Sequence, residues 1–233
     1  MSREEGHMTY ESISSGIFIS RPNRFLAQIE ISGVVEPCHV KNTGKLAELL
    51  IPGAKVYVNR ADNPNRATKY DLVSVFKGER LYNIDSQAPN KAFKEYLESG
   101  RYIDGITHIK AEAKHGSSRF DFYVETTDRK IYIETKGVTL EEDGVALFPD
   151  APTLRGVKHL NELAQCIDAG FDAHVVFVIQ MDGIHTFAPN NKTHPEFSNA
   201  LSAAQKAGVK IIALDCTVTK NSMEIRNEIK VKI

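Results

Sequence analysis

Short apolar runs separated by turn-forming residues fill residues 9–86. The runs lie at 17–19, 27–31, 34–35, 54–58, 70–76 and 81–84. Gly, Pro, Asn and Ser stand between them, as expected for strands joined by tight turns. One helical turn over 46–50 is the exception. Five or six short strands with little helix predict a small barrel or curled sheet, and an irregular β-rich cap on the second half is the alternative.

Helical periodicity appears from residue 87 onward. It predicts helices over 89–99, 153–169 and 195–207, and Thr153 is a good N-cap for the second of them. Apolar or alternating segments predict strands between the helices, at 106–113, 119–125, 130–136, 173–181, 184–188 and 209–214. The tail, 223–233, alternates weakly and suits an edge strand. The pattern therefore predicts two domains, residues 9–86 and residues 87–233, the second a mixed sheet flanked by helices.

Composition narrows the class of protein only slightly. The 233 residues include 42% hydrophobic residues, enough for a sizeable core, and the formal net charge of −1 indicates no partner. The longest strictly apolar run is 175–179, far short of the ~20 residues that a membrane helix needs. No secretion signal is recognised, and the three cysteines are far apart without a zinc pattern. We therefore expect no membrane partner and a cytoplasmic location.

The candidate chemistry lies in one predicted hairpin. Residues 120–125 and 131–136 both alternate, and Thr127-Asp128 makes a two-residue turn between them. This register pairs Tyr123 with Tyr132 and brings their apolar faces together. It also places Asp121 opposite Glu134, with β-carbons about 4.5–5.5 Å apart. Lys136 lies on the same face, two residues beyond Glu134.

Facing carboxylates repel each other, and a divalent cation removes that cost. Glu112 on the preceding segment supplies a third carboxylate. We therefore predict that Glu112, Asp121 and Glu134 bind Mg²⁺ or Mn²⁺ and that Lys136 takes a proton from water. Such a site suits metal-assisted hydrolysis of a phosphodiester. The alternative is a solvated polar face with a cross-strand salt bridge.

Residues around the hairpin offer space and positive charge. Gly116-Ser117-Ser118 and Gly137 flank the polar face and are expected to leave room for a ligand backbone. Arg155, Lys158 and His159 follow at i, i+3 and i+4 on the next helix, where they can contact phosphates. An ordinary exposed helix face is the alternative for these three residues.

These residues resemble two known groups of proteins. Glu112, Asp121 and the Glu134-Thr135-Lys136 sequence match the PD-(D/E)XK nuclease superfamily, with Phe120 where a Pro sometimes stands. From about residue 17 to 230 the chain resembles the sugar fermentation stimulation protein (SfsA) family. The likeness rests on Arg24-Phe25-Leu26-Ala27, Asn42-Thr43-Gly44, Ser118-Arg119-Phe120-Asp121-Phe122, Phe148-Pro149-Asp150-Ala151, Arg155-Gly156-Val157-Lys158-His159-Leu160 and Phe187-Ala188-Pro189. The resemblance implies an N-terminal OB-like domain, a C-terminal nuclease-like domain, and largely non-specific DNA binding.

The N-terminal domain adds candidate DNA contacts of its own. OB surfaces bind single strands on aromatic rings within a basic groove. Arg21, Arg24 and Phe25 lie close together in sequence, and Lys41, Asn42 and Thr43 form a polar, basic turn. Alternatively, Phe25 is the first core residue of its strand and 42–44 is a plain turn. The predicted DNA contacts are Arg21, Arg24, Phe25, Lys41, Asn42, Thr43, Arg119, Arg155, Lys158 and His159.

Three functions are compatible with these residues. The first is a divalent-metal-dependent nuclease that acts on DNA. The second is a DNA-binding protein that keeps a nuclease fold without turnover, which the family resemblance implies to be a regulator of sugar-use genes. The third is a metal-dependent hydrolase of small phosphate esters. The intact set of Glu112, Asp121, Glu134 and Lys136 favours the first, and a separate mildly basic β domain favours a polymer as substrate. The sequence does not indicate an oligomeric state.

Overall fold

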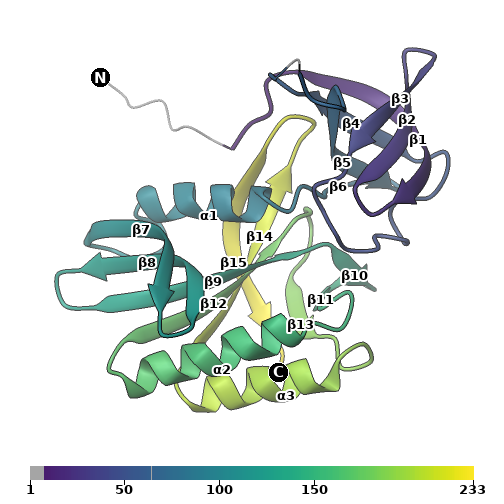
Figure 1. Ribbon diagram of the computed structural model, residues 1–233. Helices are drawn as coiled ribbons and strands as arrows, with labels where there is room; N and C mark the ends of the chain where they lie inside the picture. The colour runs from purple at the N-terminus through teal and green to yellow at the C-terminus, as the bar shows by residue number, and fades with distance from the viewer. Residues whose placement is uncertain (1–7, 64) are drawn as a thin grey trace.

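Six strands at the start of the chain form the first sheet (Figure 1). The computed structural model describes residues 8–63 and 65–233. The strands are β1 (Ile13–Asn23), β2 (Leu26–Ile31), β3 (Val34–His39), β4 (Lys55–Arg60), β5 (Tyr70–Lys77) and β6 (Arg80–Asn83). Their order is β3-β2-β1-β4-β5-β6, and an additional parallel pairing between β3 and β5 closes the first five strands into a barrel. The predicted barrel is confirmed, and the irregular cap is wrong.

Alternation along the strands explains the barrel. In β2, Ala27, Ile29 and Ile31 are buried in the barrel core, while Glu30 faces outward. Ser32 and Gly33 both adopt positive φ, 52° and 81°, in the turn to β3. Positive φ at both central residues matches the twist of a two-residue hairpin, so this turn fixes the β2–β3 register.

The rest of the chain forms a nine-stranded mixed sheet with three helices. The elements are α1 (Ala88–Glu98), β7 (Ile106–His115), β8 (Ser118–Thr126), β9 (Lys130–Val138), β10 (Leu140–Glu142), β11 (Val145–Phe148), α2 (Leu154–Asp168), β12 (Asp172–Ile179), β13 (Thr186–Pro189), α3 (Pro195–Lys206), β14 (Lys210–Val218) and β15 (Met223–Val231). The strand order is β10-β11-β13-β15-β14-β12-β9-β8-β7. The central pairings of β12 with β9 and β14 are parallel, whereas β7, β8 and β9 form an antiparallel meander.

The helices cover both faces of this sheet. α1 packs on β9 and β15 from one side, and α2 and α3 pack together on the other (Figure 1). All three helices lie where periodicity predicts them. Thr153 caps α2 as expected, because its hydroxyl accepts a hydrogen bond from Gly156 N at 3.0 Å. α2 thereby holds its first turns beside the β8–β9 hairpin.

Three strands differ from the sequence prediction. β15 is not an edge strand, since it lies between β13 and β14. Its alternation is weak because a bulge interrupts the pairing with β14, where Asp215 accepts a hydrogen bond from Asn227 N at 2.6 Å. β10 and β11 are not predicted at all, because each is only three or four residues long.

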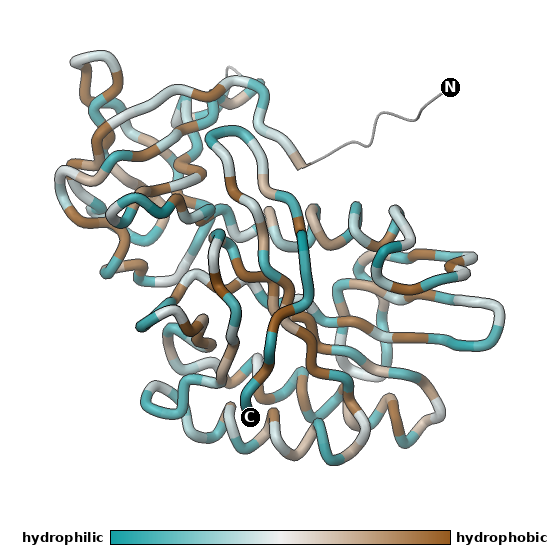
Figure 2. Tube along the Cα trace, turned by 180° about the vertical axis from the view of Figure 1, so that it is seen from behind, coloured by the Kyte–Doolittle hydropathy of each residue, from teal (hydrophilic) through white to brown (hydrophobic). Residues whose placement is uncertain are grey.

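Buried apolar side chains form two clusters. One cluster extends without interruption from the barrel, with Phe18 and Leu72, to the α2–α3 side of the large sheet, with Phe177 and Phe197. The other lies under α1 and includes Phe93 and Phe122. Figure 2 shows hydrophobic positions concentrated along the inner strands and hydrophilic ones in the outer loops. Within the described part of the chain, no helix combines the length and apolarity required to cross a membrane.

Candidate active site

The β8–β9 hairpin has the predicted register. Tyr123 pairs with Tyr132, and the ladder continues as far as Phe122 opposite Ile133. Beyond that pair, the Asp121 side chain lies between the two strands. Its Oδ2 accepts a hydrogen bond from Thr135 N at 2.8 Å and lies 2.7 Å from Thr135 Oγ1. A carboxylate thus takes the place of a backbone acceptor at the point where the strands separate.

Asn90 on α1 fixes the other side of Asp121. Its Nδ2 donates to Asp121 Oδ1 at 2.9 Å, and its Oδ1 accepts a hydrogen bond from the Thr135 hydroxyl. Sequence reasoning missed both Asn90 and Thr135. Asn90 lies 31 residues before Asp121 on a separate helix, so no local pattern connects the two.

Glu134 is the most crowded group of the site and is only 3% exposed. Its Oε1 accepts a hydrogen bond from Lys136 Nζ at 2.5 Å and also contacts Nδ1 of His159. Its Oε2 is buried and has no hydrogen-bond partner among the described residues. A buried carboxylate oxygen without a partner is costly, so this oxygen is available to a ligand.

The two carboxylates differ in proton affinity. Burial raises the pKa of Asp121, and the nearby negative charge of Glu134 raises it further, against hydrogen bonds from Thr135 that lower it. Burial also raises the pKa of Glu134, but His159 and Lys136 together outweigh it, so the net shift is downward. Glu134 therefore holds its negative charge readily, and a second charge on Asp121 is disfavoured unless a cation is present.

His159 on α2 supports Glu134 from the opposite side of the sheet from Asn90. Arg155 Nε lies 3.4 Å from His159 Nε2. Since the guanidinium can only donate, Nε2 is the acceptor and Nδ1 carries the proton that faces Glu134, a tautomer assigned from these partners. His159 is 5% exposed. The ring is therefore held against Glu134, and its predicted contact with phosphate stays a prediction. We call Asp121, Glu134, Lys136 and His159 the hairpin cluster.

The side chain of Glu112 does not join the hairpin cluster, although the β7–β8 register places its backbone opposite Asp121. Glu112 lies between the pairs Ala111–Phe122 and Ala113–Phe120, in a left-handed conformation with φ of 53°. Its side chain is 63% exposed and forms an ion pair with Arg119 at 3.5 Å. Over residues 8–63 and 65–233 no three His, Cys, Asp or Glu side chains are grouped as metal ligands. The structure thus brings together two of the three predicted carboxylates.

The open space next to the cluster lies along α2. Gly137 leaves no room for a ligand, contrary to expectation, because Gln180 Oε1 and Pro89 Cγ, the latter at 2.8 Å, fill the position of a Cβ. A groove of about 530 Å³ runs instead between the start of β8 and α2. It is lined by Ser117, Ser118, Arg119, Leu154, Arg155, Lys158 and His159. Three predicted phosphate contacts, Arg119, Arg155 and Lys158, therefore border one groove that reaches the hairpin cluster through His159.

The donor set of the hairpin cluster fits a divalent cation. Asp121 and Glu134 offer hard carboxylate oxygens, which Mg²⁺ and Mn²⁺ prefer. Glu134 Oε2 has its coordination capacity unused. Burial and the negative charge of Glu134 raise the pKa of Asp121, and a bound cation would neutralise that charge.

In the barrel, Arg24 and Phe25 form an exposed pair. The Arg24 guanidinium lies 4.6 Å from the centre of the Phe25 ring, and Phe25 is 45% exposed. The alternative that Phe25 begins the core of its strand is therefore wrong, since the residue belongs to the β1–β2 turn. A stacked ring and cation on the surface suit a nucleic-acid base and its phosphate.

Arg21 has a different position from the one expected. Its guanidinium donates to the carbonyl oxygens of Asn42, Gly44 and Lys45, each at 2.7 Å, and of Arg24 at 2.8 Å. Asn42 accepts a hydrogen bond from Gly44 N at 2.8 Å, and Thr43 is exposed at the tip of this turn. Burial lowers the pKa of Arg21. Arg21 and Asn42 therefore shape the turn, and Thr43 is the member of the set left at the surface.

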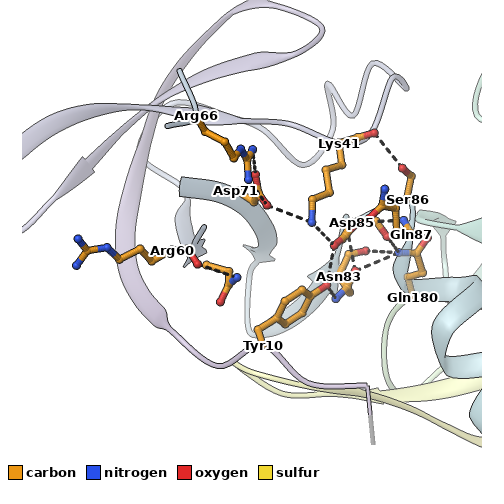
Figure 3. A network of polar contacts seen from close by, with 11 residues as sticks. Tyr10, Lys41, Arg60, Arg66, Asp71, Asn83, Asp85, Ser86, Gln87 and Gln180 are labelled. Carbon is orange, nitrogen blue, oxygen red and sulfur yellow. Dashed lines mark hydrogen bonds and ion pairs between the residues drawn. The ribbon is translucent and has the colours of Figure 1, made fainter. Parts of the chain in front are cut away.

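Lys41 is part of a partly buried ion cluster (Figure 3). Its Nζ lies 3.2 Å from Asp71 and 3.1 Å from Asp85 and forms an ion pair with each. Lys41 is therefore not free for the predicted phosphate contact. Arg66 pairs with Asp71 at 2.6 Å. We call Lys41, Arg66, Asp71 and Asp85 the junction cluster, because Asp85 is at the boundary between the two sheets. Asp85 Oδ1 accepts a hydrogen bond from Gln87 N, at the start of α1, at 2.9 Å.

Two family models match this chain. Residues 19–84 match the model described as the SfsA N-terminal OB domain, and residues 87–222 match that of the sugar fermentation stimulation protein RE domain. The chain belongs to the sugar fermentation stimulation protein family. A family member from Desulfitobacterium hafniense (strain DSM 10664 / DCB-2) is 58% identical, covering 97% of this chain and 99% of its own. Another, from Ruminiclostridium cellulolyticum, is 54% identical and covers 97% and 100%.

A solved structure of the SfsA family has the same fold. The structure of Pyrococcus furiosus SfsA in complex with Ca²⁺ superposes with a TM-score of 0.89 at 31% sequence identity. The match covers 98% of this chain and 100% of that protein. The resemblance found in the sequence is therefore confirmed over both sheets of the structure.

Proposed function

We propose that this protein is a divalent-metal-dependent nuclease that acts on DNA. The observation that carries the proposal is the carboxylate pair of the hairpin cluster, in which one oxygen of the buried Glu134 has no partner among the described residues and a lysine lies 2.5 Å from the other. Buried polar atoms normally have partners, so an unpartnered carboxylate oxygen close to a second carboxylate and a lysine favours a bound cation. The Ca²⁺ named for the Pyrococcus furiosus relative supports a divalent cation.

Each residue of the cluster has a role in this proposal. Asp121 and Glu134 would hold the cation, which would neutralise charge on the scissile phosphate and make the attacking water more acidic. Lys136, whose ammonium contacts Glu134 at 2.5 Å, donates a hydrogen bond that positions the attacking water. Asn90 and His159 hold the two carboxylates in orientation through the hydrogen bonds described above.

The surrounding cations serve to hold the polymer. Arg119, Arg155 and Lys158 border the groove that opens beside His159. Arg119 pairs with Glu112 at 3.5 Å, and Lys158 pairs with Glu162 at 3.8 Å. The side chains of Arg119 and Lys158 are each more than half exposed. Such exposed pairs are weak, so a phosphate can replace the carboxylate in each.

Cleavage of labelled DNA tests the proposal. Single-stranded and double-stranded oligonucleotides are incubated with Mg²⁺, with Mn²⁺, or with a chelator, and the products are separated by length. We expect cleavage with either ion and none with the chelator. Lys136→Ala should cleave more slowly by on the order of 10²–10⁴-fold, the usual worth of acid–base assistance, yet still bind DNA.

Lys94→Ala is the matched control. Lys94 is a half-exposed lysine on α1 that pairs with Glu98 at 3.5 Å. Its substitution should leave the rate unchanged. Equal rates for Lys136→Ala and wild type would remove Lys136 from the mechanism, and the absence of products with every ion would contradict the nuclease proposal.

A second function, DNA binding without turnover, is favoured by one observation. Glu112 is turned toward Arg119 and is outside the carboxylate pair, which leaves the cation with fewer protein ligands than predicted. In that case wild type and Lys136→Ala should bind DNA equally well, and neither should produce fragments.

A further inference from the structure

Leu154 is an unusually exposed apolar residue at the mouth of the candidate groove. It is the first residue of α2 and is 82% exposed, against 58% for Val34, the next most exposed large hydrophobic side chain among the described residues. It shares the groove wall with Arg119, Arg155 and Lys158. An apolar tip set among cations suits a partner that offers phosphates around an apolar face, as the end of a base-pair stack does.

The exposed Arg24–Phe25 pair lies a short chain of contacts away from Leu154. Arg21 joins the carbonyl of Arg24 to those of the 42–45 turn. That turn packs against the segment before α2, since a Cβ on Gly44 would lie 2.7 Å from Asp150 Oδ2. Asp150 precedes Leu154 by four residues. The Arg24–Phe25 pair and Leu154 are therefore linked through the 42–45 turn and the short segment 150–154.

The two sites suit different forms of DNA. A ring such as Phe25 stacks on a base only where that base is unpaired and unstacked from its neighbours. A leucine that projects from a helix between cations is suited to press on a base step and open it. Together they describe a nucleic acid that is paired on one side and single-stranded on the other.

We propose that the preferred substrate is DNA at a junction between duplex and single strand. Leu154 stands against the last base pair, Arg155 and Lys158 hold the duplex phosphates, and the single strand passes over Arg24 and Phe25. This inference rests on the proposed function, because it names the substrate of the same site.

Fluorescent oligonucleotides test the inference without any cleavage. Three DNAs share one sequence, a single strand, a full duplex, and a duplex with a single-stranded arm, each with 2-aminopurine at the junction position. Binding is measured by anisotropy in chelator, and unstacking by 2-aminopurine emission. We expect the armed duplex to bind at least ten-fold tighter than the other two, with an increase in emission that the full duplex lacks.

Leu154→Ser should reduce that preference to less than three-fold and abolish the emission increase, whereas Leu154→Met should retain both. Val34→Ser is the matched control, because Val34 is also exposed but lies at the opposite end of β2 from Phe25. It should behave as wild type. Circular dichroism verifies folding, which substitution of an exposed residue leaves intact.

Equal affinity of wild type for all three DNAs would overturn the inference. So would a Leu154→Ser protein with unchanged preference and emission, the result expected if Leu154 serves a protein partner instead. These outcomes are separate from those of the proposed function. A junction preference without cleavage in Mg²⁺ or Mn²⁺ would remove the nuclease and keep the inference, while cleavage without a preference would do the reverse.

Discussion

The junction cluster and the hairpin cluster each place a lysine close to buried carboxylates, yet their electrostatics differ. In the junction cluster, burial raises the pKa of Asp71, but Arg66 and Lys41 outweigh it and the net shift is downward. In the hairpin cluster, burial and the charge of Glu134 raise the pKa of Asp121. The residue types are nearly the same, so the difference comes from where the cations lie.

Hydrogen-bond partners explain the contrast. Arg66 and Lys41 both contact Asp71, and Asp85 is completed by Lys41, Tyr10 and Gln87 (Figure 3). In the hairpin cluster, Lys136 and His159 contact the same oxygen of Glu134, and the other oxygen has no partner in the described part of the chain. A complete set of partners indicates a structural role, whereas an incomplete set combined with a raised carboxyl pKa indicates a binding site.

The largest expected effect is on the junction cluster. Lys41→Met should lower the free energy of unfolding by about 3–5 kcal/mol, because it leaves Asp85 and part of Asp71 as buried charges without their cation. Urea denaturation measures the loss. Lys69→Met is the control, since Lys69 forms a single exposed pair with Glu36 and should cost less than about 1 kcal/mol. Equal losses for the two variants would contradict the structural assignment of the junction cluster.

The next effect concerns metal binding at the hairpin cluster. Mg²⁺ or Mn²⁺ at 10–100 times its dissociation constant should stabilise wild type by about 1.4–2.7 kcal/mol, a few degrees in melting temperature. Asp121→Asn should reduce the ion-induced rise in melting temperature. Asp71→Asn should show the same rise as wild type but melt at a lower temperature in chelator. Melting curves with chelator and with excess ion measure both. An identical response in wild type and Asp121→Asn would eliminate the metal site and favour the solvated polar face.

The two aspartates should also show opposite pH trends in chelator. The pKa of Asp71 is below its ordinary 3.8 in the folded state, so its stabilising contribution is present above that value and is lost as pH falls through the folded pKa. The free energy of unfolding of Asp71→Asn should therefore be lower than that of wild type by on the order of 1 kcal/mol at pH 7, and by less in acid.

Asp121 should behave in the reverse manner. Its folded pKa is above 3.8, so the unfolded state loses its proton first and wild type loses stability as pH rises toward the folded pKa. The free energy of unfolding of Asp121→Asn should accordingly rise relative to that of wild type between pH 3 and pH 7. Unfolding free energies across this range decide the matter, and parallel curves for the two variants would mean that the two carboxylates do not differ.

The smallest effect is on the salt dependence of DNA binding. Arg24→Ala should reduce the slope of log K against log salt by about 1, the value for one lost phosphate contact. Lys41→Met should leave that slope unchanged, because Lys41 already serves Asp71 and Asp85. Titrations at several salt concentrations measure both slopes, and a reduced slope for Lys41→Met would return Lys41 to the DNA surface.

Sequence periodicity predicted those features that are local. The alternation of 120–125 and 131–136 gave the hairpin register, since a shift by one residue would have exposed Phe122 and Ile133. The same reasoning found the barrel strands and the N-cap at Thr153. It did not place β15, whose bulge weakens the alternation that a central strand would otherwise show.

Features built from distant residues escaped prediction. Lys41, Asp71 and Asp85 come from three separate segments, so Lys41 alone looks like a basic turn residue. His159 falls on the charged side of α2 by periodicity, yet that side lies over the hairpin, which buries it against Glu134. Phe25 looks like the start of a strand core, but the chain is still turning at that point and the ring faces solvent.

The apolar cluster that is shared by the barrel and the α2–α3 side of the large sheet limits how freely the two domains can be exchanged. Phe18 and Leu72 belong to the same buried unit as Phe177 and Phe197, and Gln180 adds hydrogen bonds to Asn83 and Asp85 across the boundary. A chimaera that combined this barrel with the second domain of a distant relative would join two mismatched half-cores. Recombination at residue 86 is therefore disfavoured, and any engineered swap must carry both sides of the shared core together.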